Sequence, residues 1–572
     1  MMYIWRIKHC NMKMRLFLSI IFTTCAINQL NAQMWRSELY PANWKSSQDK
    51  TFYSDMLIQD FSYAGYHRGE KEIPSDFKTV MDVTKSPYNA DNTGKEDVTS
   101  VLQRAIDDAG SVKGGCVVYL PEGIYKVSVT TGKSYCLILA HSNIVLKGAG
   151  AEKTFILNSS AAMRSKAIVR IAPANSSPPL VQGKQLITKD LLSPSMIVPV
   201  QSTNGFKPGD MVLISNEIDN EWITEHHMLK YWKDMGRQLG GQKYYREIVK
   251  VNSASNELTI DIPIRYTLKM AQKAGVSIAP AMLREVGIEN LSIGNKEISE
   301  EGDWTEESYK IRENPSYQSH DSWAIAMEKV SNGWIRRVAS YCPAGNSSQA
   351  HLLSNGIKVS QTKNISIIEC NFKKPQYGGG GGNGYMYRIM GNETLIKDCV
   401  AEFSRHGFVL SGMTASGNVF LNCLDKDSGW QTGTTGNEKT SGSGSDHHMH
   451  FSHSNLFDRC TVENSFFAAG WRKWGGSAIH GITGAHSVYW SLRSNGTQAY
   501  AVQTQQGRYG YVIGTSGNKP DVCTLAWEPG TEWITDPVDF VEGKGKGEDL
   551  DPQSLYLDQC NRRLRSNVPL RR

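Results

Sequence analysis

Short apolar segments separated by turn residues recur along most of the chain, whereas stretches with long helical periodicity are few. Four segments share one pattern, in which an Asn precedes a short apolar strand that ends near a Cys: 364–370, 392–399, 418–423 and 455–460. Successive Cys residues lie 29, 24 and 37 residues apart. Irregular intervals are typical of a β-solenoid, whose turns vary in length while its strands stay in register. We therefore expect a solenoid with a buried stack of Cys side chains; a β-sandwich with fortuitous spacing is the alternative.

The segment 82–127 combines one amphipathic helix pattern with two strands. Gly114 and Gly115 end the helix, and a Pro-x-Gly turn at Pro121 joins the strands. The apolar positions of the helix share one face: Val101, Leu102, Ala105 and Ile106. This segment resembles the opening segment of the pectate-lyase superfamily. The resemblance implies an all-β, single-stranded, right-handed parallel β-helix with an N-terminal capping helix and a groove for long polysaccharides.

The N-terminus has the pattern of an export signal. Lys13 and Arg15 precede the apolar run 16–22, and the small residue Ala32 offers a cleavage point. We expect an exported protein, periplasmic or secreted. A lipoprotein is the less favoured alternative, because Cys25 lacks the small-residue context of lipid attachment. No other stretch is long and apolar enough to predict a membrane span.

The same patterns divide the rest of the chain. After the signal peptide at 1–32, the aromatic, irregular segment 33–75 is expected to wrap the outside of the solenoid, which spans 76–535. Within the solenoid, residues from about 161–285 lose the coil pattern, and we interpret them as an inserted small β-module. The charged tail 536–572 is expected to fold back and cap the last coils.

The composition changes this picture little. The chain of 572 residues is 40% apolar and 21% charged, as is normal for a folded soluble protein. Residues 1–32 contain four basic residues and no acidic one, so their removal lowers the net charge from +6 to +2. We therefore expect no nucleic-acid partner. The 11 Cys lack the dense spacing of a disulfide framework, and nothing in the sequence predicts an oligomeric state.

Residues capable of acid–base chemistry are concentrated between 401 and 500, which holds seven of the 14 His. Equivalent positions on neighbouring coils stack about 4.8 Å apart, so side chains distant in sequence can share one patch. The sequence therefore predicts a cationic patch that transfers protons. Its candidate catalytic members are Arg405, His406, His448, His450, His453 and His480.

The strand pattern at 446–453 refines this prediction. Side chains alternate between the two faces of a strand, so Met449 and Phe451 are expected to point into the core. His448 and His450 would then point outwards together, on the face that carries Asp446. A solvated polar strand and a zinc site are the alternatives, although no fourth ligand is evident.

Two further groups are candidate substrate-binding residues. Aromatic and basic residues alternate in one stretch, which suits sugar rings and acidic groups: Trp471, Arg472, Lys473 and Trp474. A core Trp pair with solvated charges is the alternative. The glycine run Gly378–Gly382 predicts a loop near the groove, and Tyr385, Tyr387 and Arg388 follow it.

Two reactions compete on this scaffold. A hydrolase needs paired carboxylates, but the Asn-Thr-Asp stretch of β-helical polygalacturonases is absent and Asp107-Asp108 lies in the predicted helix. A lyase must neutralise a uronate carboxylate, remove the neighbouring proton and protonate the leaving oxygen. We assign neutralisation to Arg405, the base to one of the His residues, and the acid to Tyr387 or His480. We predict no cofactor and no metal ligand; the sequence shows no acidic cluster for calcium, which is left open.

The segments 404–409 and 416–421 look like coils of exported Bacteroidetes-type β-helix proteins of polysaccharide breakdown. This resemblance implies a polysaccharide lyase whose partner is an anionic, uronic-acid-containing polysaccharide. The substrate would be a glycosaminoglycan, such as chondroitin, dermatan or hyaluronan, or a polymer of the pectin or alginate type. A β-helical glycoside hydrolase and a non-catalytic glycan-binding β-helix are the alternatives.

Overall fold

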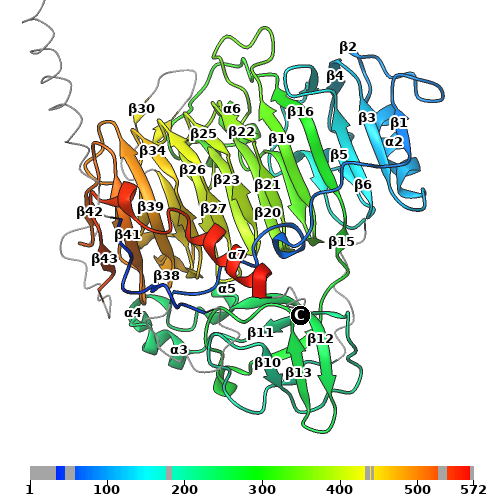
Figure 1. The fold of residues 1–572 in the computed structure, drawn as a ribbon. Helices are drawn as coiled ribbons and strands as arrows, with labels where there is room; N and C mark the ends of the chain where they lie inside the picture. Colours follow the sequence, from blue (N-terminus) through cyan, green and yellow to red (C-terminus); the bar gives the residue numbers. More distant parts are fainter. Residues whose placement is uncertain are drawn as a thin grey trace, which may run out of the picture.

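The computed structural model describes residues 34–45, 58–174, 183–431, 438–439, 444–525 and 538–566. The predicted signal peptide lies outside these residues. In the described residues, no helix has the length and apolarity needed to span a membrane. Most strands wind into coils that stack along one axis (Figure 1).

The coils form three ladders of parallel strands. The first contains β1 (Val80–Asp82), β3 (Cys116–Leu120), β6 (Ile144–Gly148), β16 (Gly287–Asn295), β19 (Trp334–Ser340), β21 (Ser366–Ile368), β24 (Leu395–Lys397), β27 (Val419–Leu421), β33 (Leu456–Asp458), β39 (Val488–Asn495), β41 (Tyr511–Ser516) and β43 (Phe540–Glu542). The second shares β16, β19 and β39 with the first and adds β2 (Thr93–Asp97), β4 (Gly123–Val127), β7 (Thr154–Asn158), β22 (Asn371–Lys373), β25 (Val400–Glu402), β28 (Leu424–Lys426) and β34 (Thr461–Glu463).

The third ladder, called here the third sheet, carries the candidate site. It contains β5 (Tyr135–Leu139), β8 (Ala167–Ile171), β17 (Trp323–Glu328), β20 (Asn355–Lys363), β23 (Tyr385–Asn392), β26 (His406–Ser411), β31 (Ser445–Met449), β35 (Phe467–Ala469), β40 (Val502–Thr504) and β42 (Val522–Cys523). The predicted right-handed parallel β-helix is confirmed, and the β-sandwich alternative is wrong.

The strands of the third sheet do not alternate strictly between core and surface. In β23, Met386 and Tyr387 both lie in the hydrophobic core, while Tyr385 packs in a separate outer cluster. Strand β17, two strands away, repeats this order: Ala324 and Ile325 lie in the core and Trp323 lies outside it. At these strands the coil therefore bends so that two consecutive side chains point inwards and the residue before them points outwards.

The Cys residues of the repeat are free thiols buried inside the coils: Cys370, Cys399, Cys423 and Cys460. Each thiol donates to a backbone carbonyl of its own or the preceding coil. The small side chains thus stack through the core without cross-linking it, as the pattern predicts. The neighbouring Asn residues form only part of a ladder, in which Asn418 Nδ2 donates to Asn455 Oδ1 over 2.9 Å.

The predicted helix is α2 (Thr99–Gly110), which lies at the N-terminal end of the coils (Figure 1). Its apolar face packs on β3, β5 and β6, and Leu102 and Ile106 enter the main core. Its role as a cap stays a prediction.

An inserted module has its own antiparallel sheet of β9 (Gln185–Leu186), β10 (Ile197–Pro199), β11 (Met211–Ser215), β12 (Lys243–Asn252), β13 (Glu257–Ile260) and β14 (Gly275–Ile278). Three short helices follow β11: α3 (Asn220–Glu225), α4 (Leu229–Trp232) and α5 (Gly236–Leu239). Because β8 belongs to the third sheet, the described strands of this module begin at Gln185 and not near residue 161. The module lies beside the later coils (Figure 1).

A buried ion cluster joins the module to the coils. Glu393 lies in the turn after β23, and its two carboxylate oxygens accept from Arg246 NH2 at 3.0 Å and Arg265 NH2 at 2.6 Å. All three side chains are at most 1% exposed. The one carboxylate offsets part of the charge of the two guanidinium groups, which also donate to backbone carbonyl oxygens.

The C-terminal helix α7 (Leu555–Ser566) packs with residues 35–45 and 58–64 across the first ladder. Smaller elements complete the described chain: η1 (Tyr66–Gly69), η2 (Met270–Gln272), β15 (Leu283–Arg284), η3 (Ser308–Lys310), α6 (Pro315–Ser319), β18 (Val330–Ser331), β29 (Trp430–Gln431), β30 (Glu438–Lys439), β32 (Ser452–His453), β36 (Trp471–Gly475), β37 (Ile479–Ile482), β38 (Gly484–Ala485) and η4 (Gly547–Asp549).

The start of α7 is held by a buried carboxyl group whose protonation we expect to control stability. Asp458 Oδ2 accepts from the Ser554 hydroxyl at 2.7 Å and the Tyr556 N–H at 2.8 Å. Burial raises the pKa of Asp458 from 3.8 to about 7. The folded state therefore binds the proton more tightly than the unfolded state does, and this contribution to stability is lost as the pH rises from about 4 to about 7.

We expect Asp458→Asn, which keeps an acceptor but cannot ionise, to lose less stability than the wild type across that pH range. The measurement is the Tm of both proteins at a series of pH values. Parallel curves would show that the pKa of this carboxyl group is the same in the folded and unfolded states.

Candidate active site

The outer face of the third sheet carries a cavity of about 740 Å³. Its floor comes from β23, β26 and β31, and its sides from residues 306–310, the loop 380–382 and the hairpin of β36 and β37. Eight of the thirteen predicted site residues line it: Tyr385, Arg388, Arg405, His406, His448, Arg472, Trp474 and His480. The structure thus brings most of the predicted cationic patch together from four coils.

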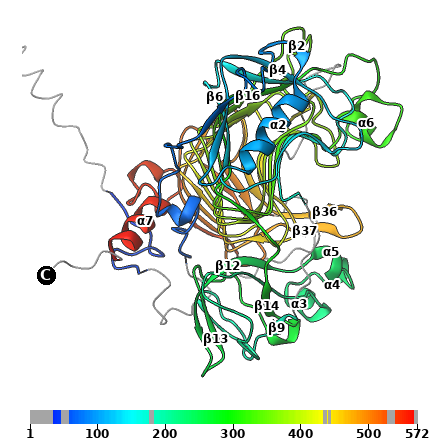
Figure 2. The same ribbon diagram turned by 90° about the vertical axis from the view of Figure 1, so that its right-hand side faces the viewer.

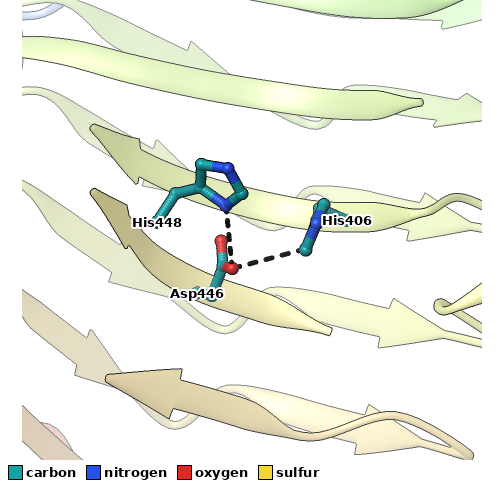
Figure 3. A group of neighbouring side chains, drawn as sticks. All are labelled: His406, Asp446 and His448. Atoms are coloured by element: carbon teal, nitrogen blue, oxygen red, sulfur yellow. Dashed lines mark hydrogen bonds and ion pairs between the residues drawn. The ribbon is translucent and has the colours of Figure 1, made fainter. Parts of the chain in front are cut away.

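Asp446 is the centre of this group. Its Oδ2 lies 2.6 Å from Arg472 NH1, 3.1 Å from His448 Nδ1 and 3.4 Å from His406 Nδ1. Figure 3 shows the two imidazole rings converging on this carboxylate from neighbouring strands. The carboxylate is 1% exposed, so it orients its neighbours instead of meeting solvent.

Hydrogen bonds connect this carboxylate through the His448 ring to the Tyr385 hydroxyl. His448 Nε2 lies 2.9 Å from the Tyr385 hydroxyl, and His448 Nδ1 lies 3.1 Å from Asp446 Oδ2. Arg472 NH1 also lies 3.1 Å from His448 Nδ1, which would require the opposite tautomer. We assign the proton to Nδ1, because the shorter contact of Arg472 is the one to the carboxylate. Nε2 then accepts from the tyrosine hydroxyl.

Burial sets the resting protonation states. It lowers the pKa of His448 well below its usual value, that of His406 to about 4 and that of His480 to about 3. Burial alone would raise the pKa of Asp446, but His406 and Arg472 hold it well below the usual range. Burial also raises the pKa of Tyr385. At neutral pH the site therefore holds neutral imidazoles, an ionised Asp446 and a protonated tyrosine.

His406, Asp446 and His448 have the types and spacing of metal ligands. Arg472 places a cationic NH1 2.6 Å from the same carboxylate oxygen, and His406 Nδ1 lies 2.9 Å from the Gly444 carbonyl oxygen. A metal ion would have to displace the guanidinium. The donor set therefore does not fit a cation as it stands.

Two arginines differ in their freedom to bind an anion. Arg405 NH2 donates to Glu306 Oε1 at 2.8 Å. Within the part of the chain that the structure describes, no carboxylate pairs with Arg388, whose Nε lies 3.3 Å from the Ser411 hydroxyl. The Arg388 guanidinium lies 5.7 Å from the centre of the Tyr385 ring. Arg388 is thus better placed than Arg405 to neutralise a carboxylate beside Tyr385.

Tyr387 points away from the cavity, contrary to its prediction as an acid. Its side chain is fully buried in the core, where its hydroxyl lies 2.8 Å from the Cys370 carbonyl oxygen. The paired inward residues of β23 place Tyr387 inside and Tyr385 outside. Tyr385 therefore takes the place in the site that the sequence assigned to Tyr387.

The predicted orientation at 446–453 is wrong beyond His448. Met449 faces the cavities, and Phe451 packs with Trp222 of the module at 5.1 Å. His450 and Phe451 both have positive φ angles, 53° and 57°, which end the strand alternation. His450 bonds to backbone carbonyls of the neighbouring hairpin and lines an adjoining cavity.

Three other candidates also lie outside the cavity. His453 is fully buried and bonds to the Tyr244 hydroxyl of the module at 2.7 Å. Trp471, a predicted substrate-binding residue, packs in the same module core, as the alternative had it for this residue but not for the exposed Trp474. Lys473 is exposed on β36 and lines neither this cavity nor the adjoining one.

A second cavity of about 740 Å³ adjoins the first and shares Arg388 and Met449 with it. It runs over β8, β17 and β20, with residues 238–241 of the module on its other side. Three basic residues occupy equivalent register positions on this face: Arg170, Lys358 and Arg388. Lys358 was not among the residues predicted from the sequence, although it precedes Arg388 by 30 residues, the length of one coil.

The N-terminal part of the chain is similar to a known protein family. Residues 83–214 match the family model described as "Rhamnogalacturonase A/epimerase, pectate lyase-like". Alginate lyase 7 of Azotobacter vinelandii is 38% identical over 76 residues, which is 13% of this chain and 9% of that protein. The similar segment thus spans only a small part of the length of that relative.

Solved structures resemble the chain over most of its length but at low identity. ORF18 of Geobacillus virus E2 has a TM-score of 0.39 and 13% identity, covering 78% of this chain and 58% of that one. The A-module of mannuronan C-5 epimerase AlgE6 of Azotobacter vinelandii has a TM-score of 0.35 and 13% identity, covering 81% and 98%. The chain is thus a right-handed parallel β-helix whose residues 83–214 match a pectate-lyase-like family model.

Proposed function

We propose that the protein is a polysaccharide lyase that cleaves a uronic-acid-containing polysaccharide by β-elimination. The observation that carries this proposal is the hydrogen-bonded series Asp446–His448–Tyr385, which ends beside Arg388, a guanidinium that pairs with no carboxylate of the described residues. These groups supply the three needs of the reaction: neutralisation of a carboxylate, a base and an acid.

The reaction follows from these contacts. Arg388 binds the uronate carboxylate, so that the proton on the adjacent ring carbon becomes acidic. The Tyr385 oxygen takes that proton while its own proton moves to His448 Nε2, and Asp446 stabilises the imidazolium. The electron pair of the broken C–H bond forms the new double bond as the bond to the glycosidic oxygen breaks. That oxygen takes a proton from Tyr385, and His448 returns its proton to the tyrosine.

A glycoside hydrolase is less well supported. It needs one carboxylic acid and one carboxylate free to act on the sugar. The described lining of the cavity has two acidic residues, and each is engaged: Glu306 with Arg405 and Glu307 with Lys310. Asp446 is buried behind the lining and pairs with Arg472. The groove shape suits a glycan-binding protein as well, but binding alone would not need a proton relay.

The test uses purified residues 33–572 on chondroitin, dermatan, hyaluronan, heparin, alginate and pectate, with and without a chelator. A lyase produces ultraviolet absorbance from the new carbon–carbon double bond. New reducing ends without absorbance would indicate a hydrolase. A change in uronate stereochemistry without chain cleavage would indicate an epimerase, and no change on any substrate would contradict an enzyme of these polymers.

We expect Lys358→Ala to raise KM more than it lowers kcat. Lys358 is one register step from Arg388 in the third sheet, its ammonium lies 5.4 Å from the Trp323 ring, and burial lowers its pKa. Loss of one charge–charge contact to the polymer costs about 1 kcal/mol or less at a partly exposed site. The measurement is the salt dependence of KM. Lys207→Ala, an exposed lysine of the module outside both cavities, is the control.

A further inference from the structure

The two adjoining cavities form one groove that extends from the candidate site in a single direction. Their lining follows the third sheet from β8 through β17, β20, β23 and β26 to β31. These strands span five lateral steps, or about 24 Å. No residue of β35, β40 or β42, the described strands beyond β31, lines either cavity.

The hairpin of β36 and β37 stands at the point where the groove stops. Its residues Trp474, Gly475 and Gly476 line the cavity next to His480 and Arg472. Viewed along the coils in Figure 2, the hairpin projects outwards between α6 on one side and α5 of the module on the other. It therefore crosses the path that a polymer would need to continue over the later coils.

The hairpin is anchored on two sides. At its base, Arg472 bonds to Asp446 in the centre of the site. On the module side, Trp232 Nε1 donates to the Ile479 carbonyl oxygen at 2.9 Å, and the Trp471 ring packs against Tyr231 at 4.9 Å. An element held by both the coils and the module is positioned as a fixed wall and not as a mobile flap.

We propose that the protein binds an end of the polysaccharide chain and cleaves near it. This inference rests on the proposed lyase activity and adds the position of the cut. The polymer lies along the groove over Arg388 and Lys358, and its terminal sugar meets the hairpin. The exposed Trp474 ring, 5.9 Å from the Arg472 guanidinium, offers a stacking face for that sugar. Short products leave from the hairpin side, while the body of the polymer stays long.

The first experiment follows product size during digestion of whichever polymer is cleaved, by size-exclusion chromatography with mass spectrometry. End-directed cleavage releases short oligosaccharides from the earliest time points while the polymer peak keeps its size. A rapid fall in polymer size with a ladder of long intermediates would overturn the proposal and leave the lyase activity intact. The experiment can therefore contradict end-directed cleavage without contradicting lyase activity.

A second experiment does not depend on turnover. Binding of the Tyr385→Phe variant is measured for oligosaccharides and for the parent polymer at equal mass of sugar. A site for chain ends binds the oligosaccharides far better, because they present more ends per mass. Equal binding by mass would overturn the proposal.

Trp474→Ala tests the wall itself. It is expected to weaken oligosaccharide binding about tenfold, the value of one ring contact, and to lengthen the products. Tyr500→Ala removes another exposed aromatic side chain outside both cavities and should change neither. If Trp474→Ala changes neither binding nor product length, the terminal contact is assigned wrongly.

Discussion

Replacing Tyr385 with Phe is expected to lower kcat on the cleaved polysaccharide by ~10²–10⁴-fold, the usual effect of losing a general acid or base. The substitution removes only the hydroxyl that lies 2.9 Å from His448 Nε2. Both proton movements of the proposed relay pass through that oxygen, so the variant lacks the group on which both steps depend. The measurement is the rate of double-bond formation at saturating substrate, together with the KM.

Tyr387→Phe is the matched control, two residues away on the same strand. Its hydroxyl bonds to a core carbonyl, so its loss is expected to lower the free energy of unfolding by about 1 kcal/mol and to leave kcat unchanged. If instead Tyr385→Phe keeps full activity and Tyr387→Phe loses it, the assignment of inside and outside on β23 is wrong.

Glu393→Gln is expected to lower the free energy of unfolding by about 3–5 kcal/mol, the range for breaking a buried ion pair from one side. The neutral amide would leave Arg246 and Arg265 charged, buried and without their shared carboxylate. Because the cluster joins the module to the coils, the loss should appear as detachment of the module before the coils unfold. Denaturant unfolding followed by tryptophan fluorescence measures it, since Trp222 and Trp232 lie in the module core.

Glu217→Gln provides the surface comparison within the same module. Glu217 pairs with Lys273 at 2.9 Å, but both side chains are at least 60% exposed. The expected cost is below about 1 kcal/mol. Equal effects of the two substitutions would contradict the view that burial makes the Glu393 cluster important.

The fold was predictable because each coil carries its own local signal. The Cys and Asn positions mark successive strands, and stacking them places distant residues such as Arg405 and Arg472 in one cavity. The choice between Tyr385 and Tyr387 was not predictable from strict alternation, because the coil bend turns two consecutive side chains inwards.

The remaining misplacements have a different cause. His453 and Trp471 carry the right chemistry for a groove, but the module packs against the coils and buries them. Nothing in the local pattern of residues 446–474 encodes where a segment 200 residues earlier will dock. The sequence placed Asp446 on the outward face with His448 and His450 but not at the centre of the site, because its role as an orienting carboxylate depends on Arg472, which reaches it from another coil.

The register of the third sheet has a consequence for how this surface measures a polymer. Arg170, Ala326, Lys358 and Arg388 occupy one row, one residue from each coil, so their pitch is fixed by backbone hydrogen bonds and not by side-chain packing. The row holds three positive charges at fixed strand spacings, with an uncharged position at Ala326. A substitution removes one charge without moving the others, and loss or gain of a coil changes the distance between the charges on either side by one strand spacing.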